Sequence, residues 1–187
     1  MIPQRIQIRG QRLARLPPPN VEIDRDTDWP ENLSFIRDYW RDRRGSRSMP
    51  GRNDISPAQL KAHLPYLLLA DVIDGGADFR YRLVGTELRQ FFRAEPSAKR
   101  MSEALAPFGA ETVEATLMSY RAVVERRAPM RLTGAGSWYG QEFKLFDALL
   151  APLSDDDTSV NMILGTFVFV WDEKNQFRDP RDSRLAG

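Results

Sequence analysis

Few side chains in this sequence belong to the types that perform covalent or metal chemistry. The 187 residues include no cysteine and a single histidine, His63. The missing thiols exclude disulfides, thiolate catalysis and cysteine-ligated zinc or iron–sulfur centres. One imidazole excludes paired histidine ligands, and a haem would need His63 as its axial ligand. Because a lone histidine before a predicted strand is typically structural, we expect no metal, no haem and no other cofactor.

Two polar segments have only part of the pattern of a ligand-binding loop. The run Asp155–Asp157 lacks the alternating acids and the distal glutamate of a calcium loop. The run GAGSWYG at 134–140 lacks the strand-to-helix context and the full spacing of a phosphate loop. We therefore predict a solvated turn for the first segment, and bulge or turn glycines on twisted strands for the second.

The sequence shows no catalytic constellation. His63 has no nucleophile that the sequence places beside it, so a Ser–His–Asp arrangement is unsupported. Paired carboxylates such as Glu142 and Asp147 are common on strands. We expect no catalytic residues.

Asp147 stands out because it falls in phase with apolar residues of a predicted strand. If that face is the core, the carboxylate needs a partner such as Arg82 or Arg131. Alternatively Phe146 and Ala148 face inward and Asp147 meets water. We favour the second interpretation.

The elements that must position these residues begin with a β-hairpin. Residues 67–73 are apolar and branched, 74–76 supply turn chemistry, and apolar and basic side chains alternate in 79–83 before Val84. Three further strands are predicted at about 129–138, 142–152 and 160–171. We expect these three to form an antiparallel meander that completes one sheet.

Helical spacing predicts the remaining elements. In 31–44 the apolar residues follow one helix face, and Gly45 sits where a C-terminal cap belongs. Ser56 and Pro57 predict a short helix to about His63. A further short helix follows Thr86, and 111–127 has helical periodicity with arginines in its last turn.

Three segments of the sequence, in the order in which they occur, resemble the standalone PAS-domain family of alphaproteobacteria. They are DISPAQLKAHLPYLLLADV at 54–72, the hairpin at 67–86 and FDALLAPL at 146–153. The resemblance implies an α+β PAS-like fold, with a five-stranded antiparallel sheet, helices over one face and an added N-terminal helix. One departure is Ser97-Ala98, where relatives commonly carry Thr-Gly. The absence of cysteine excludes the flavin–cysteine photochemistry of light-sensing relatives.

The chain divides into four expected segments. Residues 1–30 form an N-terminal extension, disordered or loosely packed, 31–64 carry helices flanking the core, 65–172 form the PAS-like core, and 173–187 are a tail. Four arginines before residue 16 could contact an anionic surface, but a net charge of +1 does not favour nucleic acid. Because the sequence has neither an apolar run of membrane-spanning length nor a secretory signal, we expect no membrane span and a cytoplasmic location.

The resemblance implies a candidate ligand pocket between the helices and the inner sheet face. Its candidate residues are Tyr81, Arg82, Thr86, Leu88, Phe92, Leu117, Tyr120, Arg131, Phe146 and Leu164. The apolar members would equally fill a solid core. A second candidate site is the stripe of the N-terminal helix, which must be buried somewhere and could form a homodimer seam. Its residues are Leu33, Ile36, Tyr39 and Trp40.

These features predict a cytoplasmic sensory or regulatory PAS domain. It would bind a small molecule or a protein partner, and would signal through dimerisation or partner docking. The alternative is an adaptor with a filled core and no ligand. An enzyme on a similar α+β fold is the least favoured interpretation.

Overall fold

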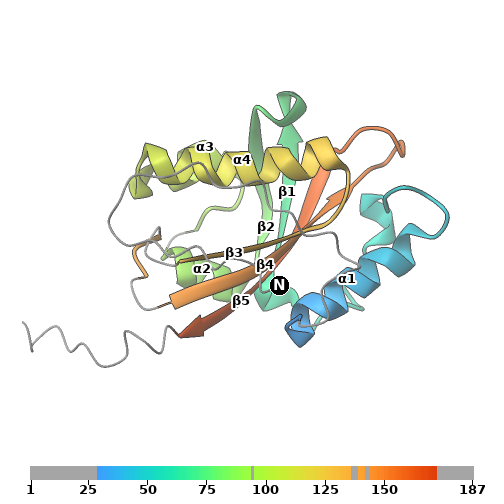
Figure 1. The fold of residues 1–187 in the computed structure, drawn as a ribbon, viewed down its shortest axis with the longest axis horizontal. Coiled ribbons are helices and arrows are strands. Elements are labelled where there is room, and N and C mark those ends of the chain that lie inside the picture. Colours follow the sequence, from blue (N-terminus) through green and yellow to red (C-terminus); the bar gives the residue numbers. More distant parts are fainter. Residues whose placement is uncertain (1–28, 94, 136–138, 142–143, 172–187) are drawn as a thin grey trace, which may run out of the picture.

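The predicted sheet is present, and the structure places β5 at its centre. The computed structural model describes residues 29–93, 95–135, 139–141 and 144–171. Its strands are β1 (Leu67–Ile73), β2 (Asp78–Val84), β3 (Met130–Ala135), β4 (Lys144–Leu153) and β5 (Met162–Trp171). They pair antiparallel in the order β2-β1-β5-β4-β3 (Figure 1). The predicted fold class, a PAS-like five-stranded antiparallel sheet with helices and an N-terminal helix, is confirmed.

Helices cover both faces of this sheet. They are α1 (Glu31–Arg44), α2 (Thr86–Phe92), α3 (Met101–Leu105) and α4 (Ala110–Arg126). Helix α1 has the predicted bounds and ends at Gly45, whose φ of 57° is readily accessible to glycine. Within the described part of the chain, no helix has the length and apolar character needed to cross a membrane.

The segment between Ser56 and the first strand differs from the predicted short helix. It is a series of turns in which Leu60 N–H donates to Ser56 O and Leu64 N–H donates to Leu60 O, followed by the 3-10 turn η3 (Leu64–Tyr66). Pro65 has no N–H to donate and prevents continuation toward β1, so the series of turns ends there.

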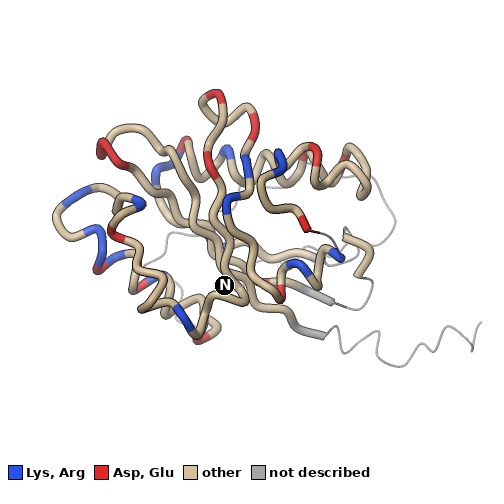
Figure 2. The backbone as a smooth tube through the Cα atoms, turned by 180° about the vertical axis from the view of Figure 1, so that it is seen from behind, with Lys and Arg blue, Asp and Glu red and all other residues tan. Residues whose placement is uncertain are grey.

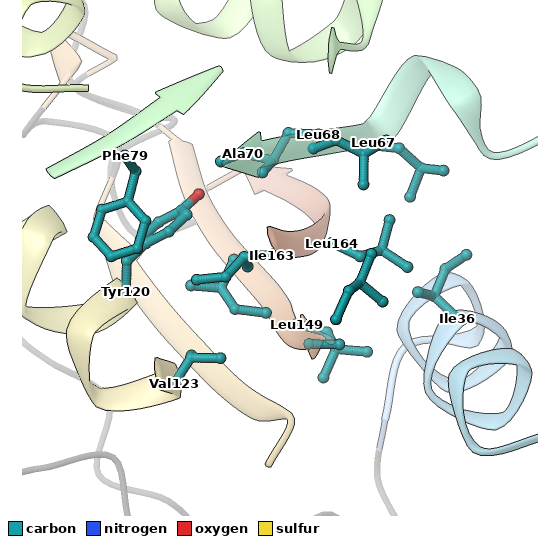
Figure 3. Packing of buried hydrophobic residues seen from close by; sticks show 14 of the residues in the cluster. Ile36, Leu67, Leu68, Ala70, Phe79, Tyr120, Val123, Leu149, Ile163 and Leu164 are labelled. Carbon is teal, nitrogen blue, oxygen red and sulfur yellow. The ribbon is translucent and has the colours of Figure 1, made fainter. Parts of the chain in front are cut away.

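The core has two layers, one on each face of the sheet (Figure 3). On the inner face Ile163 points toward α4, where Tyr120 packs on Phe79 with ring centroids 5.1 Å apart. On the outer face Leu149 and Leu164 point toward α1. Successive strand residues alternate between faces, so β5 supplies apolar side chains to both layers.

The apolar stripe of α1 is part of this outer layer. Leu33, Ile36, Tyr39 and Trp40 are 0, 0, 8 and 4% exposed, and the indole N–H of Trp40 donates to Pro152 O at 2.7 Å. The structure therefore corrects the prediction that these four side chains are free to form a dimer seam. They are buried by their own chain because the outer face of the central strands is itself apolar.

The acidic run after β4 fastens the loop to the segment that follows α1. An Asp157 carboxylate oxygen accepts from Ser48 N–H at 2.8 Å, and Asp155 accepts from Arg52 N–H at 3.1 Å. The backbone N–H groups of Ser159 and Thr158 donate to Asp156 and lower the pKa of that carboxyl. The acidic loop and the arginines after α1 lie side by side in Figure 2. The loop is a turn, as predicted, but its carboxylates bond to the segment after α1, which the prediction of a solvated turn did not include.

The departure from the family's Thr-Gly step falls on a strained backbone position. Ala98 has a φ of 66°, in the left-handed region that disfavours any residue with a Cβ. Its N–H donates to Tyr81 O at 2.8 Å, and Tyr81 N–H donates to Lys99 O at 3.1 Å. These bonds hold the strained residue against the edge of β2.

We predict that Ala98→Gly raises the free energy of unfolding by about 1 kcal/mol, because glycine removes the Cβ clash. Ala115→Gly, the same change within α4, should lower it by about 1 kcal/mol. Urea denaturation of both variants measures the two effects. A destabilising Ala98→Gly would show that this backbone is not strained.

Candidate functional site

Six of the ten predicted pocket residues belong to the inner layer or the helices that cover it. Tyr81, Leu88, Phe92, Leu117 and Tyr120 are buried, and Phe146 is partly buried. Their surroundings decide whether they line a space or fill one.

The inner layer is filled by aromatic rings in mutual contact. The Phe91 ring lies 4.3 Å from that of Phe169, 5.5 Å from that of Phe92 and 5.6 Å from that of Tyr139, centroid to centroid. Phe146 packs against the Phe91 and Tyr139 rings. These separations are those of directly packed aromatic pairs. The residues named for the interior pocket are therefore packed as core.

Three phenols, those of the buried Tyr81 and Tyr120 and of the partly buried Tyr139, lie in this interior. Burial raises the pKa of Tyr81, Tyr120 and Tyr139, and the other phenols add to the shifts of Tyr81 and Tyr120. The Tyr139 hydroxyl lies 3.0 Å from the hydroxyl of Thr116. All three groups stay neutral near pH 7, so they offer hydrogen bonds rather than charge.

The other four predicted pocket residues lie elsewhere. Arg82 is on the outer face, where its side chain is 64% exposed and pairs with Asp71 at 2.5 Å. Thr86 is exposed at the start of α2. Leu164 faces α1, as does Arg131, which lies opposite Leu149 in the strand register. The predicted set does not form one pocket, because its members are divided between the two faces of the sheet.

The structure shows that the Asp147 carboxylate, which the sequence placed in phase with apolar residues, is paired with Arg131. Two nitrogens of Arg131 donate to the two carboxylate oxygens, at 2.9 and 2.6 Å, and the side chains are 12 and 15% exposed. The guanidinium also stacks over the Trp29 ring at 5.0 Å. Phe146 and Ala148 do face the inner layer, as favoured, but Asp147 is paired with an arginine instead of meeting water.

The structure contains a surface cleft that the sequence did not predict, which we call the α1–α2 cleft. Its volume is about 670 Å³. It is lined by Glu31, Asn32, Phe35, Ala62, His63, Tyr66, Glu87, Gln90, Phe91, Phe167, Val168 and Phe169. None of the ten predicted pocket residues is among them.

The cleft follows from where strand pairing stops. Strand β1 pairs with β5 only as far as the Leu67–Thr166 pair. Beyond Thr166 the edge of β5 on that side has no partner strand among the described residues. Since three successive strand residues, Phe167–Phe169, line the cleft, it runs along this edge rather than over one face.

Gly85 allows the start of α2 to lie close to η3, and both segments line the cleft. A Cβ at this position would lie 2.2 Å from Pro65 O and 2.3 Å from Leu64 O. Only glycine therefore lets the start of α2 approach η3 this closely. Through this contact Tyr66 on η3 and Glu87 on α2 come to line one space.

His63 stands in the wall on the α1 side. Its ring stacks on that of Phe35, with centroids 4.1 Å apart and planes inclined by 14°. Its Nδ1 bonds to Asn32 Oδ1, while the amide nitrogen of Asn32 donates to the buried Thr166 hydroxyl at 3.0 Å. This chain sets the proton on Nδ1 and leaves Nε2 as an acceptor. Burial lowers the pKa of His63, and the Glu31 carboxylate acts in the opposite direction.

Two exposed aromatic side chains mark this site in the structure. Phe35 lies outside the buried stripe of α1 and is 42% exposed, and Tyr66 is 37% exposed. Large aromatic side chains off the buried face of their element are typical of binding surfaces. Their convergence with His63 could not be read from spacing, because they come from separate elements.

Comparison with known proteins places the chain in a family. Residues 30–168 match the family model of the PAS domain, so the chain belongs to the PAS domain family. The structure is similar to that of the PAS domain of BvgS from Bordetella pertussis, with 13% sequence identity and a TM-score of 0.48. The alignment covers 84% of this chain and 100% of that one. No curated protein matches the sequence.

We predict that Arg131→Met lowers the free energy of unfolding by about 2 kcal/mol, because Asp147 is left half-buried without its partner. The double variant Arg131→Met/Asp147→Leu should recover more than half of this loss. Arg82→Met, which breaks the exposed pair with Asp71, should cost less than about 0.5 kcal/mol. Urea denaturation distinguishes the three. A double variant as unstable as the single one would contradict the explanation.

The lowered pKa of His63 predicts a pH dependence of stability. The unfolded chain takes up a proton near the ordinary histidine pKa of about 6.5, before the folded chain does. The free energy of unfolding should therefore fall as the pH drops from 7 through 6.5 toward the folded pKa. His63 is the only histidine, so His63→Gln should flatten the curve between about pH 5.5 and 7. Equal slopes for both proteins would refute this assignment.

Proposed function

We propose that the chain has a sensory or regulatory role, because it belongs to the PAS domain family and PAS domains are generally sensory rather than catalytic. We propose that it senses a small molecule bound in the α1–α2 cleft and reports binding through the packing of α1 on the sheet. The observation that carries the proposal is the division of the cleft wall. Glu31, Asn32 and Phe35 come from α1, whereas Glu87, Phe91 and 167–169 come from α2 and β5.

A ligand shifts a conformational equilibrium only if it binds the two states differently. A ligand that contacts a single element makes the same contacts in both states and therefore binds both equally. In the α1–α2 cleft it contacts α1 and the core at once, so moving α1 away from the sheet removes part of its contact surface. The ligand would therefore stabilise the docked position of α1.

The contacts that hold α1 differ along its length. In its second half the Trp40 indole bonds to Pro152 O in the core. In its first half Asn32 bonds both to Thr166 of β5 and to His63 of the cleft wall. Asn32 thus belongs to the helix anchor and to the cleft together. A group that bonds to His63 would act directly on this anchor.

The second candidate function is an adaptor without a ligand, and the ring packing of the inner layer favours it. Such a protein would present the cleft to a protein partner. Homodimerisation through α1 remains part of the proposal, although the exposed Phe35 must then replace the buried stripe. A role without catalysis and a cytoplasmic location are also part of the proposal.

We predict that N-phenyl-1-naphthylamine, a neutral fluorescent aromatic, binds the cleft and slows hydrogen exchange in α1. At ten times its Kd the exchange in 31–44 should slow about tenfold, because opening requires release of the ligand. Exchange measured by mass spectrometry on the full chain, with and without the dye, tests this.

Two variants check the location. Phe35→Ser should weaken dye binding, whereas Met118→Ser should not, since Met118 is a comparably exposed apolar residue on α4 (48%) outside the cleft. Slowed exchange confined to α4, with no effect of Phe35→Ser, would place the dye in the inner layer and overturn the proposal.

A further inference from the structure

The α1–α2 cleft has an uneven charge. Two carboxylates, Glu31 and Glu87, line it, and its other lining residues include no lysine or arginine. Both acids lie in the first turn of a helix, where the helix dipole favours negative charge. The cleft therefore presents a negative rim above an aromatic interior.

Neighbouring arginines are engaged with other acids. Arg89 on α2 pairs with Glu95 at 2.6 Å, and Arg37 on α1 pairs with Asp38 at 2.9 Å. Within the part of the chain that the structure describes, neither Glu31 nor Glu87 has a salt-bridge partner. Their charge is thus available to a positive group in the cleft.

The apolar part of the wall is unusually aromatic. Phe35, Tyr66, Phe91, Phe167 and Phe169 all contribute to it. Aromatic faces attract cations through the ring quadrupole, and they stack on planar ligands. The volume of about 670 Å³ lies within the roughly 300–1,000 Å³ of small-molecule sites.

The polar groups of the cleft wall favour a ligand that donates hydrogen bonds. Nδ1 of His63 is occupied by Asn32, so Nε2 of the neutral ring can only accept. The two carboxylates also only accept when ionised. A ligand that carries N–H donors on its positive group satisfies these acceptors, whereas an anion would face them without a partner.

We propose that the ligand of the α1–α2 cleft is a small planar aromatic cation with N–H donors. This inference rests on the proposed function, because it specifies the ligand class of the same cleft. The aromatic walls hold the ring system, and Glu31, Glu87 and His63 select for the positive donor group.

Three dyes of related size and different charge test the inference on the full-length protein, freed of nucleic acid. They are proflavine, a cationic acridine with N–H donors, the neutral N-phenyl-1-naphthylamine and the anionic 1-anilinonaphthalene-8-sulfonate. Fluorescence titration should give a Kd for proflavine at least about tenfold below that of the anion. Raising the salt concentration should weaken proflavine binding and leave the neutral dye unaffected.

Variants assign the selectivity to the two carboxylates. Glu31→Gln and Glu87→Gln should each weaken proflavine binding about threefold, and the double variant about tenfold, because each removes one solvent-accessible charge from the cleft wall. Binding of the neutral dye should not change. Glu103→Gln, which removes an exposed carboxylate of α3 outside the cleft, is the matched control and should change neither.

The outcomes separate this inference from the proposed function. If the neutral dye needs Phe35 but proflavine binds no tighter than the anion, or ignores the double variant, the cation preference is wrong and the cleft remains a binding site. If no dye depends on Phe35, both proposals fail. Phe35-dependent proflavine binding that the double variant weakens supports both.

Discussion

The central strands of the sheet carry apolar side chains on both faces, and the fold must cover both faces. Strand β5 sends Ile163 toward α4 and Leu164 toward α1, so a helix layer on one face alone would leave an apolar face in water. This requirement explains why the stripe of α1 is buried within its own chain. It also makes α1 part of the core, whereas a helix on a solvated face would be free to serve as a dimer seam.

The cleft arises where this coverage ends. Pairing of β1 with β5 stops at Leu67, Gly85 brings α2 close to η3, and α1 begins on the opposite side of the exposed strand edge. The space therefore lies between the helix that is added to the PAS core and the core itself. Because α1 supplies part of the wall, a displacement of α1 would separate the walls of this cleft.

The inner layer and the α1–α2 cleft contain different kinds of polar group. Inside, packed rings and phenols that stay neutral near pH 7 make up the inner layer, and the buried Asp78 carboxylate lies close enough to act on Tyr81. In the cleft, aromatic faces stand beside two carboxylates and a histidine whose tautomer is set by Asn32. The proposed sensory role requires a place where a bound group contacts both α1 and the core, and residues of both line the cleft.

Local patterns in the chain predicted the strands, α1, α4 and the PAS fold, because periodicity, turn residues and caps act over a few neighbouring positions. They also indicated that Phe146 and Ala148 face inward. Three outcomes became visible only in the folded molecule: Arg131 pairs with Asp147, the α1 stripe is core, and Phe35 and His63 meet in a cleft. These outcomes depend on contacts between residues far apart in the chain, and on which face each element presents after packing, which no local pattern contains.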